Sequence, residues 1–309
     1  MRAQGERASP RISVIVPTCN RPVQLRDCLT ALSLQTYPRA DFEVLVVDDG
    51  SEPPIENVVT NFGDTLDVRV IRQARQGPAA ARNTGVAAAR GIVIAFTDDD
   101  CLAATDWLER MLARLDGAGE LLVGGRVVNA LNDNIFASTS QLIHEMAYEH
   151  LNADGEQPKF FSSNNIALDA DSLVRLGGFD AAFRVASEDR DLCARWHESG
   201  RALVYAPDAE VAHAHYLTLR RFWTQHFRYG RGAWRYHESL RKRGRSRFAR
   251  DLGFHGVFLR RASSPLTQRR NTVAIGALLI VWQVANVAGF VYEAIASRLP
   301  SAGPAAKIS

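Results

Sequence analysis

Apolar residues in the first part of the chain fall into short continuous runs, separated by segments with helical spacing. The continuous runs predict strands at 11–17, 42–47, 67–71, 92–96 and 121–128. Between them apolar side chains recur every three or four residues and predict helices, as in Leu25, Cys28, Leu29 and Leu32, or Leu108, Met111, Leu112 and Leu115. Strands that alternate with helices over short links predict an α/β fold, with a mostly parallel sheet and helices on both of its faces.

The chain becomes more polar after residue 129, and its expected elements are less regular. A helix is predicted near 141–150, and 162–168 is a polar turn that leads into a strand. The segment 177–180 predicts a turn beside an aromatic residue. Residues 211–215 alternate in polarity like a strand.

Acidic residues follow two of the predicted buried strands. Asp98, Asp99 and Asp100 come directly after one apolar run, and Asp48 and Asp49 after another. Neighbouring carboxylates repel each other, and a divalent cation such as Mg²⁺ or Mn²⁺ relieves that repulsion. Open α/β sheets bind ligands at the carboxyl ends of their strands. The sequence therefore indicates a metal and phosphate site there, with a solvated acidic turn as the alternative.

Further charged residues have both a functional and a structural interpretation. Arg82 lies within a predicted helix, where it could balance the acidic residues, grip a diphosphate or simply face solvent. Glu188, Asp189 and Asp191 open a helix that Ser187 can cap, and acids in a first turn also suit the helix dipole.

Composition narrows the class of protein. The 309 residues are 46% hydrophobic and 23% charged, with a net charge of +3, which is an ordinary globular balance. His213 and His215 share one face of a predicted strand, and such a pair is more often structural than metal-binding. The widely spaced cysteines indicate reduced thiols, and the polar N-terminus has no apolar segment typical of a signal peptide. A cytoplasmic catalytic part is therefore expected.

The motifs form an ordered series over residues 11–220. They are Ser-Val-Ile-Val-Pro-Thr (13–18), Val-Asp-Asp-Gly-Ser (47–51), Gly-Pro-Ala-Ala-Ala-Arg-Asn-Thr-Gly (77–85), Thr-Asp-Asp-Asp (97–100), Gly-Gly-Phe-Asp (177–180) and Glu-Asp-Arg-Asp-Leu (188–192). In this order and spacing they resemble the family 2 glycosyltransferases of the GT-A fold. Each motif is weak alone, but the series is specific.

The resemblance implies roles for individual residues. The donor, a nucleotide-diphosphate sugar, is expected to contact Pro17, Thr18, Asp48, Asp49, Arg82, Asp98 and Asp99. A metal, Mn²⁺ or Mg²⁺, is expected on the Asp-x-Asp motif of Asp98 and Asp100, with His213 or His215 as a further ligand. Cys19 stands where several relatives carry an aromatic residue that stacks on the base, so the nucleotide stays open.

The resemblance also implies the chemistry. Asp189 is the expected general base, which takes the proton of an acceptor hydroxyl as that hydroxyl attacks the anomeric carbon. Glu188, its neighbour in the motif, is expected to orient the loop or the acceptor. A single in-line displacement inverts the anomeric configuration. The acceptor is expected to be a glycan or a lipid-linked molecule, in cell-surface glycan or glycolipid synthesis.

The last third of the chain points to a membrane surface. Residues 221–270 are basic and rich in aromatics, and Gln225-His-Phe-Arg-Tyr229 is one residue from a Gln-x-x-Arg-Trp motif of processive polysaccharide synthases. Residues 271–293 form an apolar stretch that is long enough to span a bilayer. A helix that lies in the interface, or packs on the enzyme, is the alternative. Arg269 and Arg270 favour a cytoplasmic N-terminal domain.

The predicted organisation is thus a disordered N-terminus (1–10), a GT-A domain (11–220), a basic helical region (221–270), a transmembrane or membrane-associated helix (271–293) and a flexible tail (294–309). We expect a single-pass or peripheral protein on the cytoplasmic face of the cell membrane. One competing interpretation is a nucleotide-sugar-binding module without turnover. Another is a nucleic-acid-binding protein, which only the basic segment favours, so no nucleic-acid partner is expected.

Overall fold

The computed structural model describes residues 9–117, 119–152, 158–245 and 271–298. Two compact units make up the chain. The first is Met1–Arg184 with Glu188–Leu217, and the second is Val185–Ser187 with Thr218–Ser309. Residues 1–8, 246–270 and 299–309, which include most of the predicted disordered N-terminus, the end of the basic region and most of the flexible tail, lie outside the described residues.

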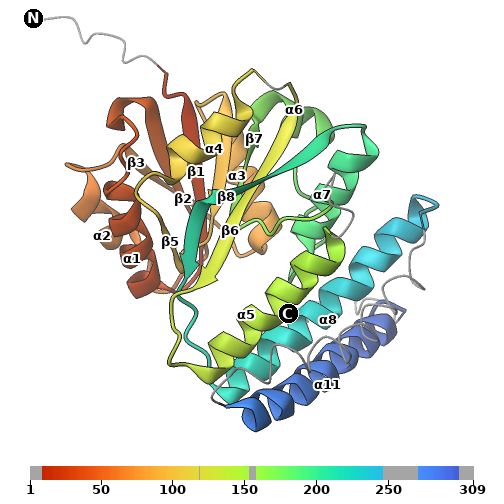
Figure 1. Ribbon diagram of the computed structural model, residues 1–309. Coiled ribbons are helices and arrows are strands. Elements are labelled where there is room, and N and C mark those ends of the chain that lie inside the picture. The colour runs from red at the N-terminus through yellow and green to blue at the C-terminus, as the bar shows by residue number, and fades with distance from the viewer. Residues whose placement is uncertain (1–8, 118, 153–157, 246–270, 299–309) are drawn as a thin grey trace, which may run out of the picture. The chain divides into compact units, whose positions relative to one another are not determined.

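The first unit is built on one eight-stranded mixed sheet (Figure 1). Its strands are β1 (Ile12–Thr18), β2 (Phe42–Asp49), β3 (Val68–Gln73), β4 (Val93–Thr97), β5 (Cys101–Ala103), β6 (Leu121–Asn129), β7 (Asn165–Asp169) and β8 (Ala202–His213). They are ordered β3-β2-β1-β4-β7-β6-β8-β5. The predicted α/β fold is confirmed.

The register of the parallel strands brings the motifs that follow β1, β2 and β4 to the carboxyl edge of the sheet. Strands β1, β2, β3 and β4 are parallel, with Thr18 opposite Asp48 at the carboxyl ends of β1 and β2. Strand β4 runs beside β1 and ends at Thr97, directly before the three aspartates. Beyond β4 the sheet changes direction, because β7 is antiparallel to both β4 and β6.

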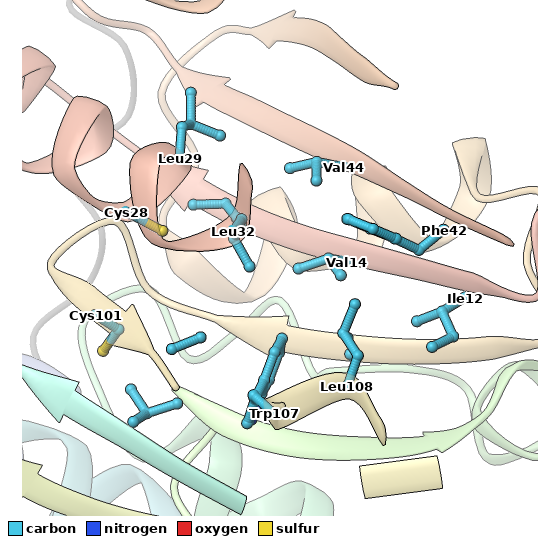
Figure 2. Packing of buried hydrophobic residues seen from close by; sticks show 14 of the residues in the cluster. Ile12, Val14, Cys28, Leu29, Leu32, Phe42, Val44, Cys101, Trp107 and Leu108 are labelled. Carbon is cyan, nitrogen blue, oxygen red and sulfur yellow. The ribbon is translucent and has the colours of Figure 1, made fainter. Parts of the chain in front are cut away.

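Helices cover both faces of this sheet. They are α1 (Pro22–Ser33), α2 (Glu56–Val59), α3 (Pro78–Ala88), α4 (Trp107–Leu115), α5 (Ile135–Leu151), α6 (Ala170–Leu176) and α7 (Glu188–Glu198), with short 3-10 turns at Arg39–Asp41 and Thr60–Phe62. On one face α1 and α4 pack against Val14 and Val44 (Figure 2). On the other face, α3 packs on β1 and β2, α6 on β7 and α7 on β8, in one apolar cluster that includes Ile15 and Leu45. Since both faces are covered, the strands read as continuous apolar runs.

Some elements differ in extent from those predicted. The helix expected to reach Arg90 ends at Ala88, and the one expected at 141–150 spans Ile135–Leu151. Strand β8 begins at Ala202, well before the predicted start at 211, and ends at His213, and its pairing with β6 skips from Ala206 to Glu210. Pro207 and Asp208 lie in that skip, and such residues mask a strand in the sequence.

The second unit contains two long helices, α8 (Leu219–Lys242) and α11 (Thr272–Ala296), which pack along each other. A Cβ added at Gly230 of α8 would lie 1.9 Å from the carbonyl oxygen of Asn286, and one added at Gly289 of α11 would lie 1.9 Å from that of Phe227. The two glycines therefore allow the backbones to touch, as small residues do at close helix crossings.

Candidate active site

The ends of β1 and β4 are joined by a direct hydrogen bond. The hydroxyl of Thr18 donates to Oδ2 of Asp99 over 2.7 Å. Pro17 lies half-buried just before it on β1, beside Val47 of β2. We call Asp98, Asp99 and Asp100 the acidic triplet. The hydrogen bond holds its middle residue, Asp99, against the end of β1.

Arginines hold the acidic triplet together. Arg21, at the entrance to α1, contacts Oδ1 of Asp99 over 3.0 Å and Oδ2 of Asp100 over 2.6 Å. Arg82 of α3 contacts Oδ1 of Asp98 over 2.6 Å. The three carboxylates are therefore gathered at the carboxyl edge of the sheet, and they do not form a solvated turn.

Arg82 also joins distant parts of the chain. Its guanidinium donates to Asp98 and, over 2.8 Å, to Oε1 of Glu188 at the start of α7. It lies 5.6 Å from the centre of the Phe179 ring, the aromatic residue of the predicted turn. Asn83 exchanges two hydrogen bonds with the Phe179 backbone. Helix α3, the turn at Phe179 and the acids Asp98 and Glu188 thus surround the buried guanidinium group of Arg82.

Burial and crowding move the pKa values of these acids. Burial raises the pKa of Asp99 to about 7, and the neighbouring charges of Asp100 and Asp98 add to the rise against the effect of Arg21. Burial also raises the pKa of Glu188 to about 7, because Arg82 only partly offsets it. Such perturbed carboxylates in a cluster are typical of functional sites.

Asp100 and His213 form a pair that could hold a divalent cation. Oδ1 of Asp100 lies 3.2 Å from Nε2 of His213, the last residue of β8. Burial raises the pKa of Asp100, but the charges of His213 and Arg21 outweigh it and lower the pKa. Cys101 has a ligand atom within 4.8 Å of both, yet burial raises the pKa of its thiol and keeps it protonated. An ionised carboxylate and an imidazole suit Mn²⁺ better than a thiol does.

The other two predicted metal ligands are placed differently. Asp98 is turned toward Arg82, and its side chain is 33% exposed. His215 lies beyond the end of β8, and its ring packs on the ring of His213 with centroids 3.9 Å apart. The described residues therefore bring Asp100 and His213 together, with Asp98 and His215 beside them.

Asp189 is the more accessible member of the Glu-Asp motif. It is half-buried, whereas Glu188 is buried. Its Oδ1 accepts a hydrogen bond from the backbone N–H of Arg190 over 2.8 Å, and its Oδ2 accepts one from Ser163 over 3.4 Å. Burial raises its pKa against those bonds and the charge of Arg82. A carboxylate with a raised pKa and an accessible side chain can accept a proton.

Asp48 and Asp49 lie beside a pocket of ≈ 600 Å³. The pocket is lined by Asn20, Gly50, Glu52, Arg72, Gln73, Ala74 and Arg75. Both oxygens of Asp49 accept backbone hydrogen bonds, from Gln76 and Gly77, so this side chain anchors the loop before α3. Oδ1 of Asp48 accepts from the Ser51 N–H, and Oδ2 lies 3.6 Å from Arg72.

Several residues of this region were not singled out in the sequence. Arg21 looks like an ordinary loop arginine, and only the pairing of β1 with β4 brings it to the acidic triplet. His144 and Tyr148 of α5 both contact the hydroxyl of Ser162, next to the residue that binds Asp189. Burial lowers the pKa of His144 to about 4, so the ring is neutral at physiological pH. His144 and Tyr148 are one helical turn apart, and this spacing was the signal in the sequence that could have pointed to them.

The sequence has relatives among curated glycosyltransferases. Glycosyltransferase AglE of Haloferax volcanii is 41% identical over 121 residues, which are 38% of this chain and 40% of that protein. A pre-mycofactocin glycosyltransferase of Mycobacterium tuberculosis is 32% identical over 215 residues, 68% of this chain and 44% of that protein. The chain thus spans less than half the length of these relatives.

Solved structures share the fold. The mannosyltransferase PcManGT from Pyrobaculum calidifontis, in complex with GDP-Man and Mn²⁺, matches 93% of this chain and 88% of its own with a TM-score of 0.67 at 20% identity. GalNAc-T7 with UDP, GalNAc and Mn²⁺ matches 73% and 51% with a TM-score of 0.54 at 16% identity. The fold is therefore GT-A, as predicted. The model of glycosyl transferase family 2 matches residues 13–190, more than half of the chain, and this protein belongs to that family.

Proposed function

We propose that this protein is a metal-dependent, inverting glycosyltransferase. It would move a sugar from a nucleotide-diphosphate sugar to an acceptor hydroxyl. The observation that supports this most directly is the convergence of the acidic triplet, Arg82 and the half-buried Asp189 at one edge of the sheet. A module that only binds nucleotide sugars has no need of a base with a raised pKa.

The donor is assigned to the carboxyl edge of the sheet. Its nucleoside would occupy the pocket beside Asp48, where Arg72 and Glu52 offer opposite charges to a base or ribose. Its diphosphate would lie against Arg21 and Arg82, whose forked guanidinium groups suit phosphate oxygens. PcManGT, which has the same fold, is solved with GDP-Man, and this supports a sugar nucleotide as the ligand.

The residues that would hold the metal are Asp100 and His213, with the partly exposed Asp98 nearby. Mn²⁺ in PcManGT and in GalNAc-T7 supports a divalent cation here. When bound, such a cation neutralises the charge that develops on the departing diphosphate. Arg21 and Arg82 would add to that stabilisation from the chain itself.

Asp189 is assigned the proton transfer. Its carboxylate would take the proton of the acceptor hydroxyl as the new glycosidic bond forms and the bond to the diphosphate breaks. The backbone N–H groups of Ser163 and Arg190 hold the carboxylate in place. Glu188, which is buried against Arg82, would position Arg82 and stay out of direct contact with the acceptor. One displacement of this kind inverts the anomeric centre.

We place the enzyme on the cytoplasmic face of a membrane, in the synthesis of a cell-surface glycan or glycolipid. Helix α11 has 25 residues, and an 18-residue stretch of it has a mean hydropathy of 1.9, so its length and composition would allow it to cross a bilayer. A lipid-linked acceptor would meet the catalytic unit at the same surface.

The test is a screen of GDP- and UDP-sugars for nucleoside diphosphate binding and release, with Mn²⁺, Mg²⁺ or excess EDTA. We expect release with a metal and none with EDTA. Asp100→Ala should abolish release and weaken nucleotide binding in Mn²⁺. Asp171→Ala is the matched control, because Asp171 is exposed on α6. Full activity in EDTA would disprove the metal, and binding without release from any donor would favour a non-catalytic module.

A further inference from the structure

The outward side of α11 is a continuous apolar surface. Between Val273 and Ile295 every exposed position is apolar or aromatic, and the exposed residues are Val273, Ala274, Ala277, Ile280, Val284, Val287, Val291, Tyr292 and Ile295. From Ile280 onward they recur every three or four residues, which aligns them on one side of the helix. We call this set the apolar row. A surface of this kind calls for an apolar partner.

The opposite side of α11 packs on α8, and the two helices run in parallel (Figure 1). His226 faces Trp282 near one end of the contact, with ring centroids 6.5 Å apart. Trp234 donates a hydrogen bond to the hydroxyl of Ser297 over 3.2 Å near the other end. Since each residue adds 1.5 Å, the contact extends over about 20 Å of α11.

A buried acid fixes this pairing. The side chain of Glu293 is 4% exposed. Its Oε2 accepts from Nε of Arg231 over 2.7 Å, and its Oε1 accepts from Nε of Arg235 over 2.6 Å. Both arginines belong to α8. The C-terminal end of α11 is therefore tied to the middle of α8 by two charge-assisted hydrogen bonds.

The helix α8 carries a second row, and it is basic. Arg221, Arg228, Arg235 and Lys242 recur every seven residues and are all exposed, so they lie along one side of the helix. We call them the basic row. Because Arg235 also binds Glu293, this row runs beside α11. An apolar row next to a basic row is the pattern of a helix surface that lies on an anionic membrane.

We propose that α11 lies in the plane of the membrane, held along α8, and does not cross the bilayer; this deepens the membrane association proposed for the enzyme and rests on it. The apolar row would enter the boundary of the acyl chains, and the basic row would meet anionic headgroups. A crossing α11 with the same packing would carry Arg228, Arg231 and Arg235 into hydrocarbon. A crossing α11 without that packing would place Glu293 on the far side, away from both arginines.

The two arrangements differ in the side on which residue 298 lies. Cys19 is half-buried and the other cysteines are buried, so Cys19→Ser gives a background of low reactivity. In that background, Arg298→Cys marks the end of α11, and Val174→Cys marks the catalytic unit, since both positions are exposed. Full-length protein in sealed inside-out and right-side-out membrane vesicles is then treated with an impermeant maleimide.

We expect both cysteines to react in the inside-out vesicles and both to be protected in the right-side-out ones. Reaction of Arg298→Cys and Val174→Cys from opposite sides would overturn the proposal. The proposal would also be overturned if the protein did not bind vesicles and light scattering showed a stable dimer, because a second copy would then cover the apolar row. Nucleoside diphosphate release, measured on inside-out vesicles that carry the unsubstituted protein, separates the two hypotheses. Release together with opposite-side labelling disproves the in-plane helix alone, and same-side labelling without release disproves the transferase alone.

Substitutions test the two rows and the tie between the helices. Arg228→Gln should lower partition into vesicles of phosphatidylcholine with phosphatidylglycerol about fivefold at low salt, while Arg26→Gln, on the exposed side of α1, should not. Glu293→Gln should speed amide exchange of α11 about tenfold. Glu238→Gln is its control, because Glu238 pairs with Arg241 on its own helix. Equal exchange in both variants would contradict the role of Glu293.

Discussion

The sheet has a buried carboxylate site at each end, and the two are built differently. At the amino end Glu43 is fully buried and accepts hydrogen bonds from the Ser13 hydroxyl, the Arg69 guanidinium and both the backbone and side chain of Arg90, over 2.7–2.9 Å. At the carboxyl end Glu188 is also buried, but its Oε2 accepts no hydrogen bond from any residue that the structure describes.

The pKa values follow from this difference. Burial raises the pKa of Glu43, yet its donors outweigh burial and hold the pKa below the usual range. Burial and the nearby Asp189 raise the pKa of Glu188 to about 7, because the charge of Arg82 offsets them only in part. A carboxylate with several donors around it is held ionised, whereas a buried one with few donors is more easily protonated. Arginine–carboxylate contacts thus accompany opposite pKa shifts at the two ends of one sheet.

The largest expected effect is at the carboxyl end. Asp189→Asn keeps the shape of the side chain and removes its basicity, so we expect kcat to fall by about 10²–10⁴-fold, the usual contribution of a general base. Nucleotide affinity should hardly change. Steady-state release of nucleoside diphosphate and titration of the nucleotide would measure the two quantities.

Glu188→Gln is the variant to compare with Asp189→Asn. We expect a smaller loss in kcat and a larger change in acceptor KM, because Glu188 acts through Arg82. An inactive Glu188→Gln beside a nearly normal Asp189→Asn would reverse the assignment. If neither variant changed the rate, the two acids would only be a favourable helix start.

A smaller effect is expected at the amino end, on stability and not on rate. Glu43→Gln leaves Arg69 and Arg90 without their shared partner, and we expect about 1–3 kcal/mol less free energy of unfolding, since both arginines are partly exposed. Denaturant unfolding measures it. The control is Glu120→Gln, because Glu120 also lies between two arginines, Arg175 and Arg201, but on the surface. Equal losses in both variants would contradict the importance of burial.

The smallest expected effect is on the pH dependence of folding stability, which should differ between Glu43 and Glu188. Glu43 has a lowered pKa, so its stabilisation is present above the ordinary glutamate range and is lost as pH falls through the lowered value. Glu188 has a raised pKa, so its contribution is present at acid pH and is lost as pH rises through about 7.

Unfolding free energies measured from acid to neutral pH would test this. The stability of the wild type relative to Glu188→Gln should fall on the order of 1 kcal/mol as pH rises from about 5 to 8. Arg82, Asp189 and Asp98 surround Glu188 and stay in both proteins. The stability of the wild type relative to Glu43→Gln should change only at acid pH. Parallel pH curves for the two variants would contradict the distinction.

Local patterns in the sequence predicted the acids of the carboxyl edge, though not Arg21, and they predicted nothing at the amino end. The apolar runs before Asp48 and Asp98 predicted both strands and placed the acids at their carboxyl ends, where open α/β sheets bind ligands. Glu43 gave no such signal, because it stands inside an apolar run. Ser13 and Arg69 reach it through the register of neighbouring strands, and Arg90 reaches it from the loop between α3 and β4.

Long-range packing accounts for the rest of what the sequence could not predict. Strand β5 has only three residues and is defined by its pairing with β8. The apolar pattern of 271–293 fits a membrane span as well as a helix on α8, and the packing on α8 is seen only in the structure, where Glu293 pairs with Arg231 and Arg235. Partners that lie 62 residues apart leave no periodic trace in the chain.

Arg82 has a consequence for recombining this enzyme with its relatives. It joins Asp98 to Glu188, and Glu188 lies 106 residues beyond Arg82 in the chain. A chimera that takes its first half from this protein and its α7 from another family member would inherit the arginine from one parent and its carboxylate from the other. An exchange of α7 keeps this contact only with parents that supply an acid at position 188, whereas a junction after Glu198, the last residue of α7, takes the arginine and its carboxylate from one parent.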